Sequence, residues 1–216
     1  AGDVLPRALI QSPSEEQANE LAKIFSERQI SRLYVVGSND VTAPVIEESY
    51  HRIVEALRAH LVEHPFIMGN RPGAADFAFF GQLTQLAQFD PTPLAVTLES
   101  APRVYAWVLL MEDLSGEEPT EDGWFAANAV PDTLKAILTE VGRVYAPFLL
   151  ANAKALEAGA EEVDTTIAGA RWTQKPFPYQ GKCLMELRKN YAALDANART
   201  AFDAIIAGTG CESIFA

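Results

Sequence analysis

The chain has 216 residues, a formal net charge of −12 and an isoelectric point near 4.7. This acidity disfavours binding to nucleic acids and to anionic membrane surfaces, and lysines and arginines are dispersed rather than gathered into a basic patch. No apolar run approaches the ~20 residues that cross a bilayer, and the first residues lack the features of a secretory signal. With only Cys183 and Cys211, we expect a soluble cytoplasmic protein with free thiols.

The first predicted helix begins at Ser12 or Ser14. Ser12 is followed by Pro13 and Glu15, whereas Ser14 is matched with Gln17 three residues on. A serine hydroxyl and an acidic or amide side chain three residues later satisfy each other's orphan backbone donors. Either start predicts one helix with the same apolar face, formed by Ala18, Leu21, Ala22 and Phe25.

Two segments lead from this helix to the centre of the chain. Residues 30–36 are rich in β-branched side chains and end at a GSND turn signal, so we interpret them as an extended connector rather than a strand. Residues 43–60 repeat apolar side chains at three- and four-residue steps, which predicts an amphipathic helix. Its expected buried face consists of Ile46, Tyr50, Ile53, Leu57 and Leu61.

The most informative stretch is 64–83, HPFIMGNRPGAADFAFFGQL. Pro65 ends the preceding helix, and Gly69 permits a turn with positive φ. Gly73 then occupies an N-cap position, and the Asp76 carboxylate can accept hydrogen bonds from the free N–H groups of the new helix. Because this helix is apolar on almost every side, we expect it to lie inside a bundle, with Gly73 and Asp76 as its structural cap.

The segment after this helix contains two shorter helices and an acidic connection. The sequence DPTP at 90–93 stops the chain, a helical piece continues to Leu98, and Ser100 is expected to cap the next helix. Residues 112–122 carry six acidic side chains and no basic one, which predicts a solvated loop or boundary.

The last part of the chain is predicted to be helical with one hairpin. A long helix opens at Pro131, continues to Gly159 and should kink at Pro147, which lacks a backbone donor. The alternating pattern at about 162–174 predicts a two-stranded hairpin. Two closing helices are expected, at 178–193 and at 196–207, the second capped by Asp195.

No pattern assigns a residue to catalysis, to metal binding or to substrate binding. His60 to His64 matches H-x-x-E-H, a zinc-ligand spacing, but Pro65 unwinds the helix at His64 and no third ligand is signalled. Nucleophile elbows and glycine-rich phosphate loops are missing from the sequence.

Residues 43–114 resemble the central helices of the helical domain of glutathione transferases, above all in the capped turn before residue 74. The family usually has Ser or Thr at the N-cap, where this chain has Gly73. The segment RWTQKPFPYQGKCLMELRKNY and the closing AGTGC resemble extensions of longer bacterial members. The resemblance implies an all-α fold, with a C-terminal-like helical bundle at 1–115 and a helical extension with the hairpin at 116–216.

In that family a thioredoxin-like half holds and ionises glutathione, and the helical half supplies an apolar wall for the electrophile. Since a helix follows Ala1 within a few residues, we expect this chain to lack the glutathione site, to carry no cofactor and to be inert alone. The full-length protein would use glutathione as co-substrate and a small apolar electrophile, and could form a homodimer. Two alternatives stay open, a non-catalytic interaction or scaffold module and a bundle binding an apolar or tetrapyrrole molecule.

Overall fold

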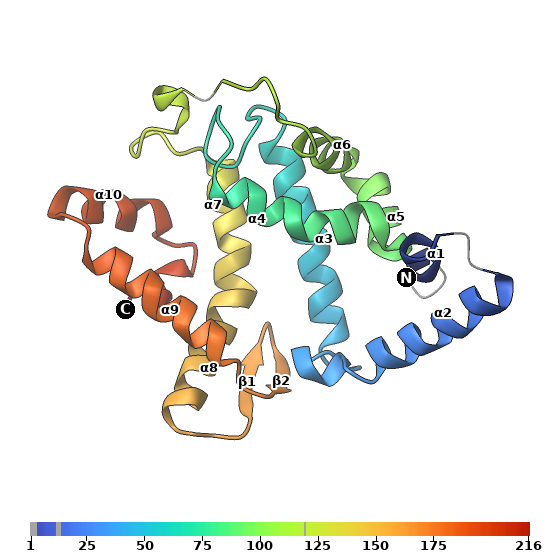
Figure 1. Cartoon of the computed structure of the whole chain (residues 1–216). Coiled ribbons are helices and arrows are strands. Elements are labelled where there is room, and N and C mark those ends of the chain that lie inside the picture. The colour runs from blue at the N-terminus through green and yellow to red at the C-terminus, as the bar shows by residue number, and fades with distance from the viewer. Residues whose placement is uncertain (1–3, 12–13, 119) are drawn as a thin grey trace.

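The computed structural model describes residues 4–11, 14–118 and 120–216 and has the predicted all-α fold with one small hairpin (Figure 1). The helices are α1 (Val4–Leu9), α2 (Glu15–Ile30), α3 (Ala43–His60), α4 (Ala74–Leu83), α5 (Pro91–Ser100), α6 (Pro102–Met111), α7 (Asp132–Glu140), α8 (Ala146–Glu157), α9 (Pro178–Ala192) and α10 (Ala196–Ile206). Short 3₁₀ and π-helical segments join them, namely η1 (Leu33–Val36), η2 (Thr84–Phe89), η3 (Glu121–Gly123), η4 (Val141–Tyr145) and η5 (Cys211–Ile214). The strands are β1 (Val163–Ile167) and β2 (Ala170–Gln174).

The largest core forms where α3 and α7 lie side by side, α5 and α6 pack on α3, and α4 packs on α6 (Figure 1). Leu57, Val104 and Val108 are completely buried at its centre. The predicted helix at 43–60 is confirmed, but its buried face is rotated. Ile46 is 37% exposed and Tyr50 and Ile53 are half-buried, because this side of α3 lines an open groove described below.

Helix α4 begins as predicted but is not enclosed. Gly69 has φ +133°, which gives the predicted turn, and α4 follows at Ala74. The expectation that neighbouring helices wrap α4 is wrong, because Phe77 is 54% exposed and only Asp76 and Leu83 are buried. The helix packs on α6 and η2 from one side, and its other side stays uncovered in the described part of the chain.

The acidic connection returns to the turn before α4 and pairs with it. Asn70 N donates to Gly123 O (2.7 Å), and Phe125 N donates to Met68 O (2.9 Å). Gly69 must be glycine here, since a Cβ at this position would lie 2.4 Å from Gly123 O. The predicted solvated loop is therefore fixed at its far end by backbone hydrogen bonds.

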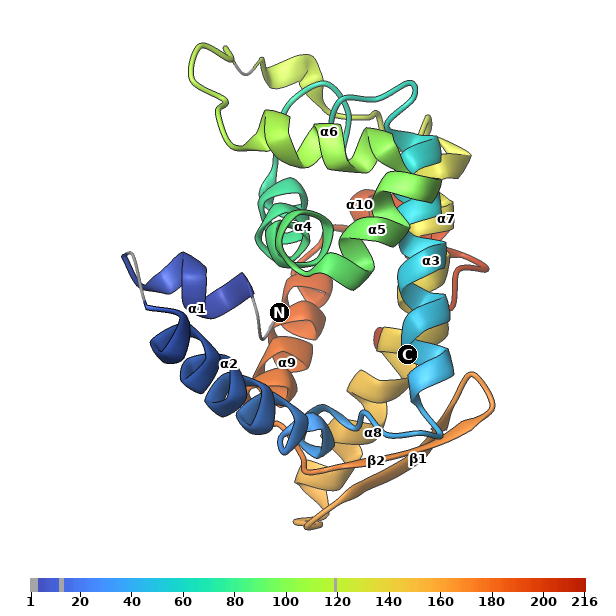
Figure 2. The ribbon, with the colours of Figure 1, turned by 90° about the vertical axis from the view of Figure 1, so that its right-hand side faces the viewer.

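Helix α2 starts at Ser14, where the hydroxyl accepts from Gln17 N and the Gln17 amide accepts from Ser14 N. This confirms one of the two predicted starts, and Ser12 lies outside the described residues. The predicted extended connector is wrong, because Leu33–Val36 forms a 3₁₀ turn that ends at Gly37 with φ +70°. From this turn α2 extends away from α3, and it packs mainly against α1 (Figure 2).

The sequence predicted that Ser100 caps α6, and this prediction is wrong. Ser100 is the last residue of α5, and its hydroxyl donates to Val96 O (2.8 Å). Ala101 occupies the cap position instead, and Pro102 starts α6 without needing a backbone donor. In the described residues no single helix is long and apolar enough to cross a membrane, and α5 with α6 reach that length only across a bend of 114°.

The long helix predicted from Pro131 is continuous but changes its winding before Pro147. The π-helical segment η4 lies between α7 and α8, and Ala146 N donates to Val141 O. A proline in the following turn cannot complete the regular pattern of hydrogen bonds, which is the predicted irregularity. Helix α7 packs on α3, while the predicted boundary between 1–115 and 116–216 stays a prediction.

The hairpin, α9 and α10 are confirmed close to their predicted bounds. The strands pair antiparallel from Val163 opposite Gln174 to Ile167 opposite Ala170. Asp195 caps α10 by accepting from Ala198 N (2.9 Å). Two smaller cores hold this part together, one of α8 with the hairpin and one of α8, α9 and the C-terminal turn.

We expect Gly142→Ala to destabilise the protein by more than about 2 kcal/mol, because overpacking a filled interior forces the backbone to shift. A Cβ at Gly142 would lie 2.0 Å from Thr209 O, where the C-terminal segment crosses η4. Gly81→Ala is the matched control in α4, where a Cβ meets no atom within 4 Å. It should stabilise by about 0.5–1 kcal/mol. Urea unfolding of both variants measures the difference, and equal effects would contradict the close approach.

Candidate functional site

The predicted cap residues lie in a buried polar cluster at the start of α4. Gly73 is the N-cap in an extended conformation, and the Asp76 side chain is fully buried. Asp76 Oδ2 accepts from Gly73 N (2.9 Å), and Oδ1 accepts from Ile67 N (2.8 Å). The second bond was not anticipated, because Ile67 is nine positions away in sequence. Burial raises the pKa of Asp76, and the two backbone donors oppose that rise.

His60 connects the end of α3 to the same cluster. Its Nδ1 lies 2.9 Å from Thr133 Oγ1 and its Nε2 lies 3.2 Å from Phe66 O. Burial lowers the pKa of His60, so the ring is neutral near pH 7. Both ring nitrogens are therefore engaged within the protein. The described residues contain no group of three or more His, Cys, Asp or Glu side chains placed to hold a metal ion.

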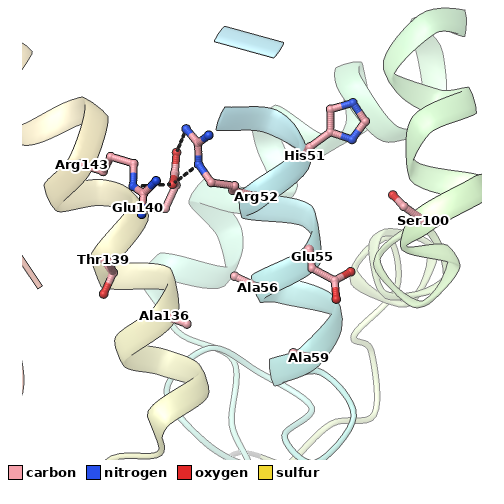
Figure 3. A pocket seen from close by; sticks show the side chains of 10 residues that line it. All are labelled: His51, Arg52, Glu55, Ala56, Ala59, Ser100, Ala136, Thr139, Glu140 and Arg143. Carbon is pink, nitrogen blue, oxygen red and sulfur yellow. Dashed lines mark hydrogen bonds and ion pairs between the residues drawn. The ribbon is translucent and has the colours of Figure 1, made fainter. Parts of the chain in front are cut away.

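A charged groove of about 730 Å³ lies between α3 and α7 (Figure 3). Three alanines, Ala56, Ala59 and Ala136, form its apolar part. The remaining lining residues are His51, Arg52, Glu55, Ser100, Thr139, Glu140 and Arg143.

Glu140 lines this groove and joins its two helices. Its side chain is only 8% exposed and accepts two hydrogen bonds from Arg52, from Nε (2.7 Å) and from Nη2 (3.0 Å). Ser49 Oγ donates a third (2.8 Å), and Arg143 Nε lies 3.8 Å away (Figure 3). The bond to Glu140 raises the pKa of Arg52. Because Arg52 forms this two-pronged pair, its positive charge is balanced by the carboxylate of Glu140 within the protein.

The charged groove lacks the arrangement of a catalytic centre. Thr139 Oγ1 donates to Lys135 O, and the Ser100 hydroxyl donates to Val96 O, each four residues back on its own helix. Neither hydroxyl is paired with a base in the described residues, whereas an activated nucleophile needs one within hydrogen-bond reach. We therefore interpret Arg52 and Glu140 as a structural link between α3 and α7.

An apolar groove of about 550 Å³ lies on the other side of α3, against α5 and η2. Its walls are mainly aliphatic, with the ring of Tyr50 among them. The lining residues are Ile46, Glu47, Ser49, Tyr50, His51, Ile53, Leu86, Thr92, Pro93 and Val96.

Tyr50 fixes the polar end of this apolar groove. Its hydroxyl lies 2.6 Å from Thr97 Oγ1, and burial raises the pKa of Tyr50, so the phenol stays protonated. The sequence placed Ile46, Tyr50 and Ile53 on one face but interpreted that face as buried core. Only the packing of α5 against α3 shows that it is a groove, whose size and lining suit a small apolar ligand.

The family described as "Glutathione S-transferase, C-terminal domain" matches residues 18–109. The match extends from α2 into α6 and includes the apolar groove and the Asp76 cluster. No curated protein and no solved structure gave a significant match to the chain.

Replacing Asp76 by alanine should lower the free energy of unfolding by more than about 2 kcal/mol. The buried N–H groups of Ile67 and Gly73 would lose their acceptor, and each unsatisfied buried donor costs about 1–3 kcal/mol. Asp195→Ala is the matched control, since Asp195 caps α10 at an exposed position and its loss should cost about 1 kcal/mol. Chemical denaturation measures both, and equal losses would show that the burial of Asp76 is unimportant.

Proposed function

We propose that this chain, whose residues 18–109 belong to the glutathione S-transferase C-terminal domain family, is the helical half of a glutathione transferase-like protein. In this role it binds the apolar electrophile of a thiol transfer or conjugation reaction. The family match carries the proposal, and the apolar groove between α3 and α5 offers a binding surface within the matched residues.

The groove has the properties that this role requires. Ile46, Ile53 and Val96 offer apolar contact, while the protonated Tyr50 hydroxyl adds a polar contact for orientation. Its volume of about 550 Å³ is within the range of small-molecule sites. Holding the electrophile near a thiolate converts a bimolecular encounter into an effectively intramolecular one.

The sulfur chemistry would be supplied from outside the described helices. In family members the thioredoxin-like half lowers the thiol pKa, and the thiolate attacks an electrophilic carbon or a disulfide sulfur. The sheet among the described residues is the β1–β2 hairpin. We therefore propose that this chain supplies the apolar wall that binds the electrophile and holds no cofactor itself. Glutathione would be the co-substrate of the full-length protein.

We also propose a reducing, cytoplasmic setting. Both cysteines of the chain, Cys183 and Cys211, are free. Cys183 is half-buried on α9, whose buried residue is the neighbouring Leu184. Burial raises the pKa of Cys211, which disfavours its thiolate.

The test is binding of 1,3-dinitrobenzene, an aromatic electrophile analogue without a leaving group, measured by equilibrium dialysis. We expect a Kd on the order of 0.1–1 mM for so small a ligand. Ile46→Glu places a charge in the groove and should weaken binding more than about fivefold, because it desolvates a carboxylate beside the ligand. Leu98→Glu, on α5 outside the groove and 48% exposed, is the control and should bind like the unaltered chain. Absence of binding, or equal weakening by both variants, would refute the assignment.

A second function, an interaction module, is favoured by the apolar surface of α2 and η1. Large apolar side chains at 24, 30, 33, 34 and 36 are about half exposed or more. They lie within thirteen positions of one another, and clustered exposed apolar side chains mark interaction sites. The partner that we propose for this surface is the same surface of a second copy of the chain, which would form a homodimer.

Sedimentation velocity of the chain at about 1–100 µM, the range over which weak dimers form, measures its association and so tests the interaction module. Concentration-dependent dimerisation that Ile30→Glu abolishes would support it, since Ile30 is 68% exposed. Val62→Glu, 56% exposed in the turn after the far end of α3, is the control and should leave the association unchanged. A monomer throughout the range would exclude a homodimer through α2.

A further inference from the structure

The apolar groove has one formally charged residue in its lining, and that charge is negative. Glu47 is the acidic residue of the lining, and neither lysine nor arginine lines the groove in the described part of the chain. Glu47 is an exposed residue of α3, so its side chain reaches solvent at the rim of the groove. The other polar side chains of the lining are formally neutral, namely Ser49, Tyr50, His51 and Thr92.

Glu47 lies on the face of α3 that carries His51, not on the face that carries Arg52. It is four residues before His51, so the two side chains share one helix face. Figure 3 shows His51 directed away from Arg52 and Glu140. Arg52 is already paired, since its Nε lies 2.7 Å from Glu140 Oε2 and its Nη1 lies 3.4 Å from Glu48 Oε2. No hydrogen bond or ion pair connects the Glu47 side chain to another described residue, so its charge is free to pair with a ligand.

Two hydroxyl groups of the groove have no proton to offer an anionic ligand. Thr97 Oγ1 donates to Pro93 O (2.8 Å), so the bond of 2.6 Å between Thr97 and Tyr50 must use the proton of Tyr50. Ser49 Oγ donates to Glu140 Oε1 (2.8 Å). Because both protons are directed to protein acceptors, neither hydroxyl offsets the negative charge of the rim.

We propose that the groove selects apolar ligands that carry a positive charge, such as an alkylammonium group, and that Glu47 is the residue that selects them. This inference rests on the proposed function, since it takes the groove as the ligand site. The apolar body of the ligand would lie against Ile46, Ile53 and Val96, with its ammonium group at the rim beside the Glu47 carboxylate. An anionic ligand of the same shape would be repelled there. The net charge of −12 acts in the same direction over longer distances.

Equilibrium dialysis of three naphthalene ligands tests the proposal. In neutral solution 1-naphthylmethylamine is a cation, 1-naphthylmethanol is its uncharged counterpart of nearly the same shape, and 1-naphthoate is an anion. We expect the amine to bind about two- to fivefold more tightly than the alcohol, the range of an ion pair exposed to water, and the naphthoate to bind most weakly. The preference for the amine should shrink at high salt, which screens exposed charges.

Two neighbouring variants locate the charge that selects the ligand. Glu47→Gln and Glu48→Gln each remove one negative charge, so they change the overall charge of the protein equally. Glu48 lies outside the lining and is paired with Arg52. Glu47→Gln should bring the amine and the alcohol to equal affinity, whereas Glu48→Gln should keep the preference. Glu47→Lys should reverse the preference, so that the naphthoate binds more tightly than the amine.

The outcomes separate this inference from the proposed function. If the alcohol binds the unaltered chain but the amine binds no more tightly, the inference is wrong while the groove remains a ligand site. The same conclusion holds if Glu47→Gln keeps the preference, or if both glutamine variants lose it to the same extent. If none of the three ligands binds, or if Ile46→Glu does not weaken binding of the alcohol, the groove is not the ligand site and both proposals are overturned.

Discussion

The buried carboxylate of Asp76 connects pieces of backbone that no helix could connect by itself. It accepts from Ile67 in the turn after α3 and from Gly73 at the start of α4. His60 adds bonds to Phe66 O in the same turn and to Thr133 at the start of α7. Because these polar groups are away from water, each depends on its partners being present, so the cluster fixes how α3, α4 and α7 meet.

This fixed junction determines where open surface remains. With α7 on one side of α3 and α5 on the other, α3 borders two grooves of different character. The charged groove is lined by the ion pair of Arg52 with Glu140, which links α3 to α7. At the apolar groove the link between α3 and α5 is a neutral one, between the Tyr50 hydroxyl and Thr97 Oγ1 (2.6 Å). The same helix therefore has one face that carries an ion pair and another face that is mainly apolar.

The C-terminal half contributes a different kind of constraint. Gly142 allows the C-terminal segment to cross η4 at backbone contact, and Gly37 allows η1 to rest on the Trp172 ring. Both contacts join segments that are far apart in sequence, and both need the absence of a side chain. The Trp172 ring that Gly37 meets also lines a cavity of about 230 Å³, together with Phe148 and Phe177.

The sequence by itself determined the local elements. Proline positions, capping pairs and apolar periodicity predicted α3, the start of α4, the hairpin and the Asp195 cap, because these depend on residues within a few positions of one another. The capped turn before α4 resembles that of the glutathione transferase helical domain, and the model of that family matches residues 18–109.

Only the tertiary structure decided which predicted faces are covered. Periodicity marks a face as apolar but not what packs on it, so Ile46 and Phe77 were expected in the core and are exposed. Several contacts join groups from separate elements. They are the bond of Asp76 to Ile67, the link between Arg52 and Glu140, and the wall of the cavity that Trp172 and Gln180 line. Such contacts depend on the relative placement of helices, which a one-dimensional pattern does not contain.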